Sequence, residues 1–98
     1  MIMADLHLNL KKEYFDAIKA GTKKYEYRKV TPYWSKRLEH PHYINIILKC
    51  GYPRSDDQER IIKRRFVGWH KETITHPHFG NKPVEVYAIH VGEIPKEE

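Results

Sequence analysis

Clustered ionisable side chains lie in residues 21–28 of this 98-residue chain, which read Gly-Thr-Lys-Lys-Tyr-Glu-Tyr-Arg. Glu26 and Arg28 are two residues apart, so in a strand they project from the same face and can pair. Together with Lys23 or Lys24 they form a net positive site, which suits a phosphate group or the hydrogen-bonding edge of a nucleobase. The alternative is an ordinary solvated strand face with a surface ion pair, which contributes little to stability.

Aromatic and basic residues follow one another in residues 31–37, which read Thr-Pro-Tyr-Trp-Ser-Lys-Arg. Tyr33 and Trp34 can stack on unpaired bases while Lys36 and Arg37 contact the phosphate backbone. A Trp at helical spacing from a Leu is more often part of the core, so this segment has both a binding and a packing interpretation.

The composition favours a polyanionic partner. Eighteen Lys and Arg against thirteen Asp and Glu give a net charge of +5 and an isoelectric point near 9.3. Such a charge favours nucleic acids through phosphate neutralisation and counterion release. The densest basic run is Lys-Arg-Arg at residues 63–65. Strand alternation directs Arg64 away from its two neighbours, so we expect this run to form a solvated strand face.

Two pairs of closely spaced histidines and one cysteine complete the candidate reactive residues. His40 and His42, like His76 and His78, lack an accompanying framework of Cys or carboxylate ligands, so no metal site and no cofactor is expected. Cys50 ends an apolar stretch without any sign of activation, which indicates a small core residue. A lone cysteine also agrees with a reducing compartment.

The elements that must position these residues follow from hydrophobic periodicity. We expect five or so strands with two short helices near the N-terminus, which indicates an α+β class and a small, mostly antiparallel β-barrel formed by one domain over residues 1–98. The expected strands are residues 6–10, 23–30, 43–50 and 84–91, with a long bent strand or a hairpin at 60–75 that bends at Gly68. The expected helices are residues 11–20 and 31–39, and residues 95–98 are expected to fray.

No apolar run approaches the roughly 20 residues of a membrane span, and the first residues lack the features of a secretion signal. We therefore expect a cytoplasmic protein without a membrane partner.

The run Gly-x-Lys-x-x-Glu-x-Arg at residues 21–28 follows a Leu-x-Leu segment and a short helix that ends in Ala-Gly. This arrangement resembles the signature of the ASCH family, relatives of PUA domains, and matches it at all four fixed positions over a region of about residues 6–38. The resemblance implies a PUA-like β-barrel whose cleft, beside the first helix, holds Lys23, Glu26 and Arg28. It also implies binding of RNA or a modified nucleoside. We expect the RNA to be single-stranded, and DNA stays open as a partner.

The resemblance leaves room for enzymatic activity, because one bacterial branch of the family consists of N4-acetylcytidine amidohydrolases and ribonuclease activity has been proposed for others. In that branch a Thr nucleophile stands three residues after the motif Lys, where this chain has Glu26. Amide hydrolysis here would need a water activated by Glu26, with Lys23 polarising the carbonyl. A metal-independent ribonuclease would use Glu26 as general base on a ribose 2′-hydroxyl, and Lys23 and Arg28 to stabilise the phosphate. A third alternative is a small adaptor that docks a protein partner.

Overall fold

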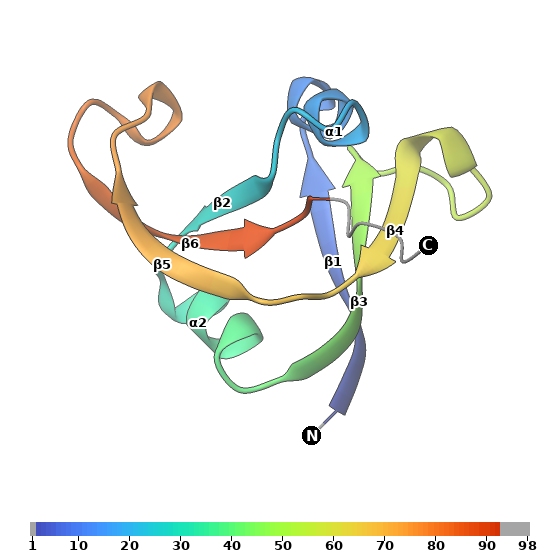
Figure 1. The fold of residues 1–98 in the computed structure, drawn as a ribbon, viewed down its shortest axis with the longest axis horizontal. Coiled ribbons are helices and arrows are strands. Elements are labelled where there is room, and N and C mark those ends of the chain that lie inside the picture. The colour runs from blue at the N-terminus through green and yellow to red at the C-terminus, as the bar shows by residue number, and fades with distance from the viewer. Residues whose placement is uncertain (1, 93–98) are drawn as a thin grey trace, which may run out of the picture.

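The computed structural model describes residues 2–92, with the side chains of residues 2–4 and 78 left out; the tail expected to fray, residues 95–98, lies outside this range. The described part of the chain is a mixed α+β structure in which six strands form two three-stranded sheets accompanied by two helices (Figure 1). No helix within it is long and apolar enough to cross a membrane. Along the chain the elements are β1 (Ile2–Leu10), α1 (Lys12–Lys19), β2 (Tyr25–Lys29), α2 (Pro32–Leu38), β3 (His42–Cys50), η1 (Gln58–Arg60), β4 (Ile61–Arg65), β5 (Trp69–Ile74), η2 (Pro77–Phe79) and β6 (Val84–His90).

The first sheet has the strand order β1-β3-β4, with β1 and β3 parallel and β3 and β4 antiparallel. The predicted alternation is confirmed, because Leu6, Leu8 and Leu10 are all buried, although the strand begins at Ile2. Two parallel strands cannot be joined by a tight turn. The connection from β1 to β3 therefore runs through α1, β2 and α2, so the motif segment lies within a crossover.

The second sheet has the order β2-β6-β5, and both of its pairings are antiparallel. Its central strand β6 is buried on both faces, since Val86, Tyr87, Ala88 and Ile89 are each 0% exposed. Strand β2 lies at the edge of this sheet. Three of the four strand pairings within residues 2–92 are antiparallel, as the sequence predicts.

Residues 60–75 connect the two sheets. The hairpin alternative for this segment is wrong, because β4 pairs with β3 and β5 pairs with β6. Figure 1 shows the chain leaving β4, bending and running into β5 in the other sheet. The bend falls at Gly68 as expected, where φ is +112°, a conformation that favours glycine. The Gly68 carbonyl accepts a hydrogen bond of 3.0 Å from the His90 amide, which ties the bend to β6.

One hydrophobic core unites both sheets and both helices. Side chains of β1 and β3 pack with those of β6, and the helices add Phe15 and Ile18 from α1 and Leu38 from α2. Cys50 packs against this core while partly exposed, which agrees with its predicted packing role.

Arg64 of β4 turns into the molecule, whereas Lys63 and Arg65 are exposed, so the predicted alternation of this basic run is confirmed. Its guanidinium group donates hydrogen bonds to the carbonyl of Val91, just after β6, and to that of Ile18 near the end of α1. Arg64 therefore joins the first sheet to α1 and to the end of β6, a structural role that the composition of the run does not reveal.

We expect Arg64→Met to lower the free energy of unfolding by about 2–3 kcal/mol, because the two carbonyls lose charge-assisted donors. The matched control is Arg65→Met, which removes the same group from an exposed neighbouring position and should stay within about 0.5 kcal/mol of wild type. Urea unfolding followed by circular dichroism measures both variants. Equal losses in the two variants would contradict the role assigned to Arg64.

Candidate functional site

Strand β2 places Glu26 and Arg28 on its core-facing side. Glu26 lies opposite Ile89 and Arg28 lies opposite Tyr87, both of which belong to the core, and directly paired residues of antiparallel strands share a face. Glu26 is only 7% exposed. The common face predicted for the two charged residues is confirmed, but its interpretation as a solvated surface is wrong, because this face is turned toward the interior.

Two cations compensate the buried carboxylate of Glu26. The Arg28 Nη2 atom lies 3.0 Å from Oε2, and the Lys23 Nζ atom lies 3.7 Å from Oε1. Arg28 Nη2 also donates a 3.1 Å hydrogen bond to the carbonyl of Asn9 on β1. An unpaired buried carboxylate would be strongly unfavourable, so these ion pairs are a condition for placing Glu26 at this position.

The turn after α1 determines where Lys23 lies. Gly21 takes a positive φ of +85°, and the backbone amide of Lys23 donates to the Ala17 carbonyl at 3.2 Å. This turn folds the chain back over the end of the helix. The Lys23 ammonium group then lies between two rings, 5.2 Å from the ring centroid of Tyr14 and 5.0 Å from that of Tyr27. The motif glycine and lysine thus act together, the first by allowing the turn and the second by entering the site.

These charged residues line a pocket of about 400 Å³, which is within the range of about 300–1,000 Å³ typical of small-molecule sites. Its described lining carries one carboxylate, that of Glu26, and three cationic side chains, Lys23, Arg28 and Lys29. Five aromatic residues complete most of the wall: Tyr14 from α1, Tyr27 from β2, Tyr33 and Trp34 from α2, and Phe79 from η2.

Helix α2 supplies two of these five aromatic residues, Tyr33 and Trp34, which form the aromatic wall on its side of the pocket. Its predicted start is confirmed, because the Thr31 side chain accepts a 3.3 Å hydrogen bond from the Trp34 amide and Pro32 occupies the first turn. Trp34 packs against the core, which confirms its packing interpretation, and it also lines the pocket. The Arg28 guanidinium carbon lies 5.1 Å from the Trp34 ring centroid, within range of a cation–π contact.

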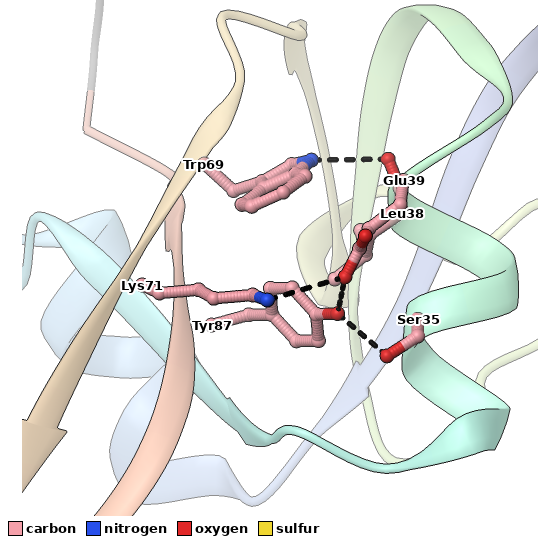
Figure 2. A network of polar contacts seen from close by, with 6 residues as sticks. All are labelled: Ser35, Leu38, Glu39, Trp69, Lys71 and Tyr87. Atoms are coloured by element: carbon pink, nitrogen blue, oxygen red, sulfur yellow. Dashed lines mark hydrogen bonds and ion pairs between the residues drawn. The ribbon is translucent and has the colours of Figure 1, made fainter.

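A buried tyrosine holds α2 against the second sheet (Figure 2). The phenol of Tyr87 donates to the Glu39 carboxylate, and its oxygen lies 2.6 Å from the Ser35 hydroxyl. Because the phenol has one proton to give, Ser35 is the donor in the second bond. Burial raises the pKa of Tyr87, and the hydrogen bond from Tyr87 lowers the pKa of Glu39.

The same network reaches β5. The Trp69 indole donates a 3.0 Å hydrogen bond to the carbonyl of Leu38, the last residue of α2, and its ring meets that of Tyr87 edge to face at 4.9 Å. Lys71 adds an ion pair of 3.5 Å with Glu39 (Figure 2). Helix α2, and with it the aromatic wall of the pocket, is thereby fixed at its C-terminal end.

The structure brings together five of the eight predicted nucleic-acid-binding residues in this pocket, which are Lys23, Glu26, Arg28, Tyr33 and Trp34. Lys24 lines neither this pocket nor the second one described below. It is exposed, and its aliphatic chain lies beside Gly92. Lys36 and Arg37 line the second pocket, which shares Tyr33 and Trp34 with the first.

Sequence reasoning missed six residues of the pocket wall: Tyr14, Tyr27, Lys29, Thr31, His76 and Phe79. In the sequence, the position of Tyr14 indicates only the apolar face of a helix. His76 and Phe79 come from the connection between β5 and β6, far from the motif in sequence, and no local pattern indicates that they reach it. His76 therefore takes part in the pocket wall, which its spacing from His78 did not suggest.

Comparison with known proteins adds nothing to this geometry, because no family model, no curated protein and no solved structure matches the chain.

We expect Glu26→Gln to lower the free energy of unfolding by about 2–3 kcal/mol, because two partly buried cations lose their counter-charge. The control is Asp16→Asn, which breaks the shorter ion pair of 2.6 Å with Lys12 on the exposed face of α1. Exposed pairs contribute little, so this control should hardly change the urea midpoint. An equal loss of stability in the two variants would show that the ion pairs of Glu26 stabilise the fold no more than an exposed ion pair does.

The contribution of the Tyr87–Glu39 hydrogen bond to the free energy of unfolding should depend on pH. Because the pKa of Glu39 is lowered in the folded protein, this stabilisation is fully present above the ordinary value of 4.5 and is lost as the pH falls through the lowered value. Tyr87→Phe should therefore be less stable than wild type at about pH 6, and the difference should narrow toward about pH 3.

Urea unfolding at several pH values measures this difference. Tyr52→Phe, at a position that is 92% exposed, is the matched control and should follow wild type throughout. A difference between Tyr87→Phe and wild type that stays constant with pH would contradict the assignment.

Proposed function

We propose that this protein binds single-stranded RNA and holds an unpaired nucleotide in the pocket beside β2. The observation that carries the proposal is the composition of that pocket, where Lys23, Arg28 and Lys29 lie among aromatic rings in a cavity of about 400 Å³. Cationic side chains neutralise phosphates, and aromatic faces stack on bases that have left a helix. Neither a purely apolar cavity nor a purely charged surface would meet both requirements.

The geometry suggests a division of roles. Trp34 and Tyr33 offer ring surface for a base, and Tyr33 is the more accessible of the two, at 55% exposed. Lys23 and Arg28 face the phosphate or the base edge, and Glu26 holds both cations in place. A single strand is favoured over a duplex because a base can reach such a pocket only when it is unpaired.

The fold belongs to the same proposal. We infer a PUA-like barrel of the ASCH type, for which the support is the motif at residues 21–28 and the hydrogen bond from Arg64 on β4 to the Val91 carbonyl just after β6. Besides the bond from His90 to Gly68, the amides of Val91 and Gly92 both donate to the Lys24 carbonyl, at 2.9 and 3.2 Å. These bonds continue the pairing of β2 and β6 to the point where the chain approaches the first sheet.

Binding takes precedence over hydrolysis because of how Glu26 is held. A general base must present a free lone pair to the proton that it removes. Each oxygen of this carboxylate lies against a cation, Oε1 against Lys23 and Oε2 against Arg28, so Glu26 already has the role of positioning these two side chains. Binding uses Glu26 as the residue that positions both cations, whereas the ribonuclease and amidohydrolase alternatives add a proton transfer to the same carboxylate.

Lys23→Ala should weaken binding to a labelled single-stranded RNA by at least about tenfold, since it removes a cation from the pocket. The matched control is Lys24→Ala, which changes the net charge of the protein equally but outside the pocket, and it should weaken binding less than about threefold. Gel retention at fixed salt measures both variants, with a modified-nucleoside competitor and a single-stranded DNA of the same sequence alongside.

The same gel tests hydrolysis when the RNA is scored for cleavage with and without chelator. Retention without cleavage agrees with the proposal. Cleavage by wild type but not by Glu26→Gln would assign a ribonuclease instead, and equal losses in Lys23→Ala and Lys24→Ala would show that general charge, rather than the pocket, binds the RNA.

A further inference from the structure

A second pocket of about 440 Å³ adjoins the first. Both pockets are lined by Tyr33 and Trp34, so these two residues form a shared wall between them. Their rings meet edge to face, 5.2 Å apart at 76°. An RNA strand with a base stacked on this aromatic pair in the first pocket can therefore continue directly into the second pocket.

The second pocket carries its own cations. Lys36 and Arg37 line it, together with Asp5 and Tyr43. Asp5 is already engaged, since its carboxylate accepts a 3.0 Å hydrogen bond from the Asn45 side chain. The pocket therefore has two cations and one carboxylate that is already hydrogen-bonded. This net positive charge favours binding of a further phosphate.

Arg37 is also held in place beside the aromatic wall. Its guanidinium carbon lies 3.5 Å from the Tyr33 ring centroid, and Nη1 donates a 3.3 Å hydrogen bond to the Tyr33 carbonyl. A guanidinium group stacked in this way keeps outward-facing donors that can bind a phosphate. The stacked Arg37 and Tyr33 thus join the aromatic wall to the basic lining of the second pocket.

We propose that the ligand is a strand of at least two nucleotides rather than a free nucleoside. One nucleotide occupies the pocket beside β2, the chain crosses Tyr33 and Trp34, and the phosphate of the next nucleotide binds Lys36 and Arg37 in the second pocket. This inference rests on the proposed function and specifies its substrate class. Linking two occupied sites makes the second binding event intramolecular, which can raise the apparent affinity by about 10²–10⁴.

The experiment compares a random-sequence RNA hexamer with an equimolar mixture of the four 5′-mononucleotides as competitors of a labelled RNA. For wild type the hexamer should bind at least about tenfold more tightly than the mixture. The double variant Lys36→Gln/Arg37→Gln should lose most of that advantage while its affinity for the mononucleotides stays within about threefold of wild type. Circular dichroism confirms that it is folded.

The matched control is Lys63→Gln/Arg65→Gln, which removes two charges from exposed positions on β4 and should retain the advantage of the hexamer. Equal binding of hexamer and mononucleotides by wild type, or equal losses in the two double variants, would overturn the inference and leave the nucleotide pocket standing. Failure of wild type to bind either competitor or the labelled RNA would instead overturn the proposed function itself.

Discussion

Burial of the Glu26 carboxylate is the constraint on which the site depends. A carboxylate on the core-facing side of β2 must be compensated, and it draws Arg28 from the same strand and Lys23 from the turn after α1. The bond from Arg28 to the Asn9 carbonyl adds β1 to this set. Three elements thus fix two cations at the pocket wall. Side chains ordered before binding lose less conformational entropy when a ligand arrives, which favours affinity.

The aromatic side of the site depends on Tyr87. This residue lies on the buried central strand β6, and its hydroxyl bonds Ser35 and Glu39 of the α2 region. The helix itself is only seven residues long, too short to be stable alone. Packing and these polar contacts therefore hold it, and they fix Trp34, on which the proposed base would stack.

Local patterns in the sequence predict much of the fold and part of the site, and the reasons for the limit are physical. Alternation correctly groups Glu26 with Arg28 and separates Arg64 from its neighbours, but alternation cannot tell which face of a strand is buried. That depends on the pairing of β2 with β6, residues far apart in the chain. Contacts between distant residues also bring Phe79 into the pocket wall. They likewise determine that residues 60–75 cross between the sheets, because β4 pairs with β3 and β5 pairs with β6.

The most direct test of the account is to locate the RNA on the protein by ultraviolet crosslinking of a 4-thiouridine-labelled single strand, followed by mass spectrometry of the crosslinked peptides. If the two pockets bind RNA, crosslinks should form at Tyr33, Trp34 and neighbouring residues of these pockets, and they should disappear when unlabelled RNA competes. Specific crosslinks concentrated instead on the exposed residues of β4, with none in the segment that carries α2, would contradict it.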